Sequence, residues 1–208
     1  MSLDETSTPS RGCPFAGRPR LGIKPEGRAC VGAGRCGVCS AAGVDRPLIA
    51  GRYRVEAFLA SGYYADVFRA RDRASSVATA LKVYVDDPPR RDAWGHEVSS
   101  LTNLRHPRIP RLRGALEVEG WLIAAMDLVG GVGLRELVES RGPLGVGDAV
   151  RLGIEVGEAL EHVGTLGWTY RDLHPRNVHV GTPVGAMLLD FDGARPPGWP
   201  AFPSGRVG

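Results

Sequence analysis

The segment from Tyr170 to Asp190 constrains the fold of this chain most, because it places three oxygen-bearing side chains at fixed spacings. Asp172 and Asn177 lie on one loop, pinned by Pro175, and Asp190 follows at the end of a short apolar strand. Turn preference explains each residue singly, but not their joint order and spacing. Carboxylate, amide and phosphate oxygens are the ligands that Mg²⁺ prefers. The spacing therefore predicts a cleft suited to metal-assisted phosphoryl transfer.

The rest of the chain shows two different patterns, one on each side of Gly130. Before it, strands are expected at 52–59, 65–71, 78–85, 113–119 and 121–128. One amphipathic helix is expected along Trp94, Val98, Leu101 and Leu104. After it, helices are expected at 134–139 and 147–166, with short strands at 178–180 and 186–189. The sequence therefore predicts an α+β fold, in which a small antiparallel sheet lobe with one helix precedes a mainly helical lobe, with a cleft between them.

Lysine is almost absent from this chain. Of the 26 basic residues only Lys24 and Lys82 are lysines, and the others are arginines. Because arginine is the default here, Lys82 on its strand indicates a place for a compact ammonium group. A buried ammonium needs an anionic partner, and Glu97 on the following helix is the candidate, since such a pair can hold the ammonium toward phosphate groups. The alternative is a surface lysine and a solvated glutamate.

Composition argues against several classes of function. The formal net charge is only +3, and no basic stripe is interleaved with aromatic residues, so a nucleic-acid partner is not expected. The longest apolar stretch, at 121–126, is too short to cross a bilayer. The first thirty residues lack the apolar run of a secretory signal. A cytoplasmic protein without a membrane partner is therefore expected.

The first 47 residues differ from the rest. They are rich in Gly, Pro, Ser and Arg, have no apolar period, and are expected to form a flexible arm. All four cysteines lie in this arm, at Cys13, Cys30, Cys36 and Cys39. Their C-x-x-C pair and two outlying thiols could supply four ligands to a structural Zn²⁺, and unpaired cytosolic thiols are the alternative. The Pro- and Gly-rich tail at 195–208 is also expected to be disordered.

Six motifs follow one another in a fixed order. They are L-x-x-G-x-Y-x-x-V at 59–67, A-L-K at 80–82, Glu97 with His106-Pro107, M-D-L-V at 126–129, Y-R-D-L-H-P-R-N at 170–177 and L-L-D-F at 188–191. In this order they resemble the motifs of the protein kinase superfamily, and of bacterial Ser/Thr protein kinases in particular. The resemblance covers about residues 51–193. It implies a bilobal kinase fold with an N-lobe at 48–129 and a partial C-lobe at 130–194.

The resemblance also implies ATP- and Mg²⁺-dependent phosphoryl transfer to protein hydroxyls, with a role for each candidate residue. Lys82, paired with Glu97, would contact the α- and β-phosphates, and Asp172 would be the catalytic base. Asn177 would complete the catalytic set, and Asn177 and Asp190 would be the Mg²⁺ ligands. The implied ATP-binding residues are Gly62, Val67, Ala80, Lys82, Met126, Asp127, Val129 and Asp190.

Several positions depart from the pattern of the family. Ala60 and Ala65 stand where the outer glycines of the hairpin are expected. Tyr170 replaces the customary histidine, and Asp192 replaces the glycine that follows D-F. His174 takes the usual lysine position, where a mostly neutral imidazole is a poorer charge stabiliser.

Only 18 residues follow Asp190, so the A-P-E element and the later substrate-binding helices are expected to be missing. That absence should expose apolar surface under Leu173 and the long helix. Such a chain is expected to bind ATP with Mg²⁺ but to phosphorylate protein substrates poorly. Two alternatives stay open. The first is a small-molecule phosphotransferase, because D-L-H-P-x-N and L-L-D-F-D-G-A also resemble aminoglycoside and choline phosphotransferases. The second is a non-catalytic, pseudokinase-like module that binds nucleotide or a partner.

Overall fold

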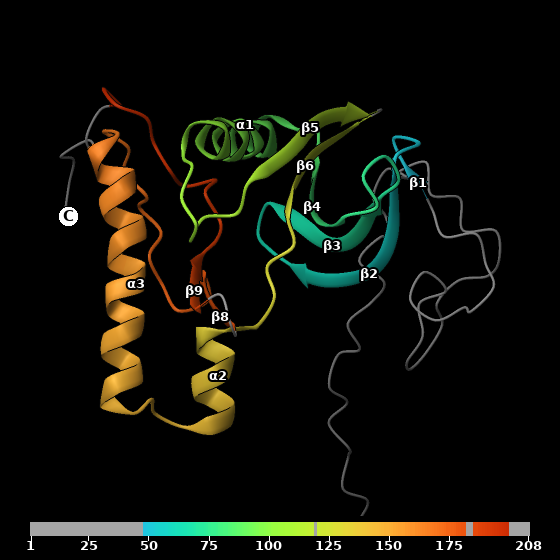
Figure 1. Cartoon of the computed structure of the whole chain (residues 1–208). Helices are drawn as coiled ribbons and strands as arrows, with labels where there is room; N and C mark the ends of the chain where they lie inside the picture. The colour runs from blue at the N-terminus through green and yellow to red at the C-terminus, as the bar shows by residue number, and fades with distance from the viewer. Residues whose placement is uncertain (1–47, 119, 182–184, 200–208) are drawn as a thin grey trace, which may run out of the picture.

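The computed structural model describes residues 48–118, 120–181 and 185–199. The predicted arm lies outside the described residues with its four cysteines, Cys13, Cys30, Cys36 and Cys39, and so does the end of the predicted tail. The zinc site therefore stays a prediction. Within the described part, a curled sheet with one helix is followed by two helices and a small second sheet (Figure 1).

The first sheet has six antiparallel strands in the order β1-β2-β3-β4-β6-β5 (Figure 1). Their bounds are β1 (Leu48–Ile49), β2 (Tyr53–Ser61), β3 (Ala65–Asp72), β4 (Ala78–Val85), β5 (Leu112–Val118) and β6 (Trp121–Asp127). Five of them correspond to predicted strands, and β4 has the predicted bounds. Strand β1 is not predicted, because two residues carry no readable alternation.

Helix α1 (Pro88–Asn103) packs on β4, β5 and β6. Its start is fixed by Asp87, whose side chain accepts a hydrogen bond of 3.1 Å from the backbone N–H of Arg90. The two prolines occupy the first turn, where no N–H donor is needed. The buried residues of α1 include Glu97 and Leu101. The helix therefore carries a carboxylate to the sheet.

The second half contains α2 (Leu134–Arg141), α3 (Val146–Thr165) and a sheet of three strands in the order β7-β8-β9. The strands are β7 (Val132–Gly133), β8 (Val178–Gly181) and β9 (Gly185–Leu188). Only β7 lacks a counterpart in the sequence prediction. It enters the sheet through Gly131, which has φ +94° and lies so close to β8 that an added Cβ would be 2.2 Å from the carbonyl oxygen of Val180. Only glycine fits there.

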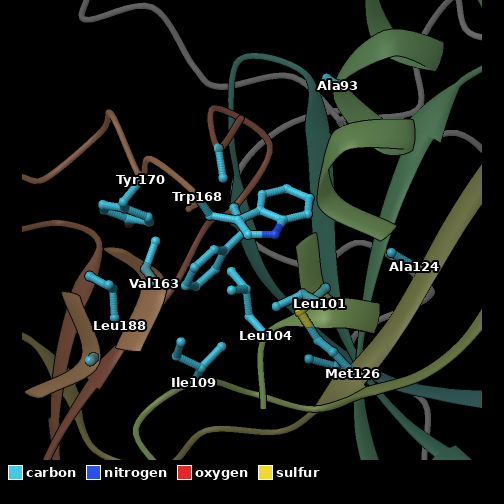
Figure 2. Close-up of a cluster of buried hydrophobic side chains, with 14 of the residues drawn as sticks. Ala93, Leu101, Leu104, Ile109, Ala124, Met126, Val163, Trp168, Tyr170 and Leu188 are labelled. Carbon is cyan, nitrogen blue, oxygen red and sulfur yellow. The ribbon is translucent and has the colours of Figure 1, made fainter. Parts of the chain in front are cut away.

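Two hydrophobic clusters lie on opposite faces of the first sheet. The smaller one includes Leu81 and Val83 of β4, and the larger one includes Ala80 and Tyr84. Lys82 therefore shares the face of Ala80 and Tyr84, since side chains alternate along a strand. The larger cluster continues from α1 and β6 into α3 and the segments that follow it, with Trp168 near its centre (Figure 2). The two halves of the structure thus share one core.

Part of α3 carries apolar side chains that nothing covers in the described structure. Val150 is 56% exposed, Ile154 59% and Leu173, on the following loop, 54%. The expectation of exposed apolar surface at this helix and loop therefore agrees with the structure. None of the described helices is long and apolar enough to span a membrane.

Candidate active site

Lys82 and Glu97 form the ion pair that the sequence indicates. Lys82 lies in the middle of β4 and Glu97 on the buried face of α1, and the Lys82 Nζ to Glu97 Oε2 distance is 3.1 Å. The two residues are only 9% and 1% exposed. The alternative of a surface lysine and a solvated glutamate is therefore wrong.

Asp190 approaches the same ammonium from the second half of the chain. Its Oδ1 lies 2.6 Å from Lys82 Nζ. Asp190 directly follows Leu189 and adopts φ +62°, a left-handed conformation that is uncommon for a residue other than glycine. Such backbone conformations persist where surrounding contacts hold them. Here the Tyr170 hydroxyl donates to the carbonyl of Leu189, and the Leu189 N–H donates to the carbonyl of Asn177 at 2.8 Å.

Asp172 and Asn177 form a second group on the loop before β8. The side-chain amide of Asn177 donates from Nδ2 to Asp172 Oδ2 at 3.0 Å and to the Asp172 carbonyl at 3.1 Å. His174 accepts from the backbone N–H of Arg176 at Nδ1, so its Nε2 carries the proton and faces Asp172 Oδ2 at 3.5 Å. Among the residues described, Asp172 Oδ1 and Asn177 Oδ1 make no hydrogen bond. These are the two oxygens left for a ligand.

The two groups are adjacent, although no hydrogen bond in the described part of the chain joins Asp172 or Asn177 directly to Lys82 or Asp190. A Cβ added to Gly193 would lie 3.5 Å from the Asp172 Cβ, which places the segment after Asp190 against the loop. Tyr170 and Phe191 pack edge to face with their ring centroids 5.0 Å apart. The Tyr170 that replaces the customary histidine therefore still ties the loop to Asp190.

Asp192 is a site residue whose contacts sequence reasoning did not identify, because its position suggested only a lost glycine. Its Oδ2 lies 3.3 Å from Lys82 Nζ. One oxygen each of Glu97, Asp190 and Asp192 lies within 4.8 Å of the others. Glu97 Oε2 also accepts from the backbone N–H of Phe191 at 2.9 Å, which fixes the chain between the two aspartates to α1.

These contacts shift the pKa values of the three carboxyl groups in different directions. Burial raises the pKa of Glu97 to about 7, with Asp190 and Asp192 adding to the rise and Lys82 opposing it. Burial also raises the pKa of Asp192, and the neighbouring Asp190 raises it further. For Asp190 the effect of burial is outweighed by Lys82, which holds the pKa of this carboxyl below its usual value. Lys82 in turn keeps its proton, because the nearby carboxylates overcome the effect of burial and raise its pKa.

The predicted nucleotide-binding residues lie on the sheet and at its end. Ala80 of β4 is paired with Met126 of β6, and Val67 of β3 with Lys82. Val129 lies just beyond β6, and in the described part of the chain neither its N–H nor its carbonyl is hydrogen-bonded. The backbone N–H of Asp127, by contrast, already donates to the Arg111 carbonyl at 3.0 Å.

The hairpin between β2 and β3 is tight at its tip. The Gly62 N–H donates to the Ala65 carbonyl at 2.8 Å, and a Cβ on Gly62 would lie 3.2 Å from that oxygen. Ser61 Oγ donates to Asp66 Oδ1 at 2.6 Å, which closes the hairpin below the turn. A glycine at the tip is therefore favoured by local packing, and Tyr63 next to it is 87% exposed.

The arrangement as a whole fits a phosphate-binding centre with a divalent cation. It offers the Lys82 ammonium, the carboxylates of Asp190 and Asp192, and the amide oxygen of Asn177, which makes no hydrogen bond among the described residues. Phosphates bind ammonium groups, and Mg²⁺ binds carboxylate and amide oxygens. Val129, just after β6, adds backbone groups that are not hydrogen-bonded within the described residues, and Ala80 pairs with Met126 on the adjoining strands. The chemistry of the donor set thus fits both ATP and Mg²⁺.

Comparison with known proteins agrees with this geometry. The model of the protein kinase domain family matches residues 53–197. The chain is 30% identical over 145 residues to the serine/threonine-protein kinase PknE of Mycobacterium tuberculosis, an alignment that covers 68% of this chain and 26% of that protein. It is 32% identical over 152 residues to the serine/threonine-protein kinase pkn3 of Myxococcus xanthus, covering 69% and 28% respectively.

A similar match extends to a eukaryotic protein. The chain is 31% identical over 148 residues to the calcium/calmodulin-dependent protein kinase type 1B of Rattus norvegicus, covering 67% of this chain and 42% of the rat protein. The chain therefore spans about a quarter of the length of the bacterial relatives it matches. The family model covers well over half of the chain, and the curled sheet with its single helix confirms the predicted kinase-like fold. The chain belongs to the protein kinase family.

Proposed function

We propose that the chain binds ATP with Mg²⁺ and transfers the terminal phosphoryl group to serine or threonine hydroxyls of a protein substrate. The observation that carries the proposal is the position of Lys82, whose ammonium contacts Glu97 of α1 and Asp190 of the second half at once. The names of the matched relatives, which are serine/threonine kinases, support the choice of substrate.

The proposal gives each side chain a task. Lys82 binds phosphate oxygens, and Glu97 keeps its ammonium in place. Asn177 and Asp190 would hold the Mg²⁺, which neutralises charge on the phosphates when it is bound. Asn177 also holds Asp172 Oδ2, so that Oδ1 of this carboxylate is free to orient the attacking hydroxyl and accept its proton.

The nucleotide and cation compete with a contact that already exists. The 2.6 Å pair between Lys82 and Asp190 occupies both the ammonium and a carboxylate that the proposal assigns to ligands. The pair must open when ATP binds with its cation. Without ligands, Lys82 and Asp190 therefore hold each other in place, and on ligand binding phosphate oxygens would replace Asp190 at Lys82, while Asp190 would hold the cation.

Two variants test the proposal in the purified chain. MgATP should raise the melting temperature, since a ligand at a hundredfold excess over Kd stabilises by about 2.7 kcal/mol, and Lys82→Ala should lose that rise. Asp172→Asn should keep the rise but lower phosphoryl transfer to a serine/threonine peptide by roughly 10²–10⁴-fold, the usual share of a general base. The control is Asp148→Asn, which makes the same change at an exposed position of α3. Asp148 pairs there with the exposed Arg151.

The outcomes separate the alternatives. No MgATP-dependent rise in wild type would contradict nucleotide binding and leave a non-catalytic interaction module. Transfer to aminosugars or choline but not to peptides would contradict the protein substrate and favour a small-molecule phosphotransferase. Transfer that Asp172→Asn leaves unchanged would contradict the role of this carboxylate.

A further inference from the structure

Asp192 has no task in the proposed function, yet its side chain reaches the ammonium that the proposal gives to phosphates. Its Oδ2 lies 3.3 Å from Lys82 Nζ, and the side chain is only 15% exposed. Among the residues described, the other partners of this ammonium are Glu97 and Asp190. The proposed function uses both, since Glu97 keeps the ammonium in place and Asp190 would hold the cation. Asp192 is therefore the one described partner of Lys82 that the proposed reaction does not use.

The turn that carries Asp192 is fixed through its backbone. The Ala194 N–H donates to the Phe191 carbonyl at 3.1 Å. Arg195 Nη1 donates to the carbonyls of Asp192 at 3.1 Å and of Ala194 at 2.8 Å. Phe191, on the other side of Asp192, is fully buried. A contact made by a segment that is already ordered costs little further entropy, so the fold itself favours the contact of Asp192 with Lys82.

The charges around Lys82 also oppose an incoming phosphate. Within the described structure, three acidic side chains contact this one ammonium. Lys82 is buried, and charges interact more strongly where water is excluded. A phosphate that approaches Lys82 is therefore attracted by the ammonium but repelled by the carboxylate of Asp192.

We propose that Asp192 is an autoinhibitory residue, whose carboxylate occludes the Lys82 ammonium in the ligand-free chain and so opposes the binding of phosphates. The inference rests on the proposed function, because it concerns the nucleotide which that function requires. Asp190 leaves Lys82 to hold the cation, whereas Asp192 has no ligand to receive it and must be displaced. If about nine in ten free chains have the contact, the apparent Kd for nucleotide is about ten times that of a chain without it.

The scarcity of lysine allows the occlusion to be measured without nucleotide. Lys24 and Lys82 are the only lysines of the chain. Acetylation by limiting acetic anhydride in metal-free buffer, followed by peptide mass spectrometry, gives the labelling rate of Lys82 relative to that of Lys24. Asp192→Asn should raise this ratio several-fold, because an ammonium that has lost a carboxylate partner gives up its proton and meets the reagent more readily.

Isothermal titration calorimetry with MgATP measures the inhibition itself. Asp192→Asn should lower the Kd by about tenfold if the contact is present in about nine in ten free chains. The control is Asp92→Asn, which removes a negative charge from the exposed side of α1. Asp92 makes no contact with Lys82 in the described structure, so both measurements should match wild type. An equal change in the two variants would mean that only the total charge matters, and would overturn the inference.

The two measurements keep this inference and the proposed function apart. A labelling ratio that Asp192→Asn leaves unchanged would overturn the inference, and so would an unchanged Kd where wild type binds MgATP. If the asparagine variant does not fold, Asp192→Gly removes the side chain and gives the same two readouts. Faster labelling of Lys82 with no MgATP binding in either chain would contradict the proposed function and still support the occlusion of Lys82.

Discussion

At Glu97, burial and ion pairing act on one carboxylate in opposite directions. The residue is 1% exposed, and burial raises its pKa from 4.5 to about 7 although Lys82 lies 3.1 Å away. Between these two pH values the folded chain binds a proton that the unfolded chain releases. The group therefore contributes most to stability below pH 4.5, and this contribution is lost as the pH rises through 7.

Glu97→Gln isolates this contribution, because glutamine resembles the protonated acid at every pH. The melting temperature of wild type minus that of Glu97→Gln should fall as the pH rises from about 4.5 to about 7. Thermal unfolding followed by circular dichroism measures both. Glu117→Gln, which changes an exposed partner of Arg91, should show no such trend. A constant difference for Glu97→Gln would mean that the carboxylate ionises in the folded chain as it does in the unfolded one.

The sequence could predict part of the site and not the rest. Because lysine is so scarce in this chain, the sequence identifies Lys82 as a site residue. The cost of burying its charge then predicts an anionic partner on the next helix. The contact of Asp192 with Lys82 depends on the turn after Leu189, where Asp190 has φ +62°. Local preference makes that backbone uncommon for aspartate, so no pattern in the sequence reveals where the next side chains point.

At the scale of the element, α1 matters because it carries Glu97. The N-terminal cap of this helix is Asp87, which accepts from the Arg90 N–H at 3.1 Å and pairs with the Arg90 side chain. Asp87→Ala should lower the free energy of unfolding by about 1 kcal/mol, the usual cost of losing such a cap. Urea unfolding measures the change. Asp86→Ala, next to it but outside the cap, should cost less, and an equal loss in both variants would contradict the capping role.

Local sequence determines the bounds of some helices and strands much better than those of others. Strand β4 has the predicted bounds, since its apolar run A-T-A-L-K-V-Y-V stands between polar segments. The start of α1 comes earlier than its apolar face suggests, because Pro88 and Pro89 lie inside its first turn instead of before it. Strands β1 and β7 have two residues each and exist only through pairing with β2 and β8. Pairing between distant segments leaves no periodic signal in so short a stretch.

At the scale of the whole molecule, the two halves are joined by packing as well as by the Lys82–Asp190 pair. The larger cluster contains Leu101 of α1, Val163 of α3 and Phe191 beside the carboxylates, and Trp168 lies among them (Figure 2). Because one core holds both halves, the distance between Lys82 and Asp190 depends on packing far from either charge. The geometry of the site and the stability of the fold therefore share the same interactions.

Trp168→Ala tests this coupling. The indole is 8% exposed, and truncating a buried tryptophan costs about 3–5 kcal/mol. That is a large fraction of the 5–15 kcal/mol typical of a folded domain, so the urea midpoint should fall sharply. Because the core is continuous, helix loss by far-UV circular dichroism and loss of tertiary packing by near-UV circular dichroism should still coincide. Trp199→Ala, which removes a 48% exposed side chain, should change the midpoint little. Two separate transitions in the Trp168 variant, with one half still folded, would show that the halves do not depend on a common core.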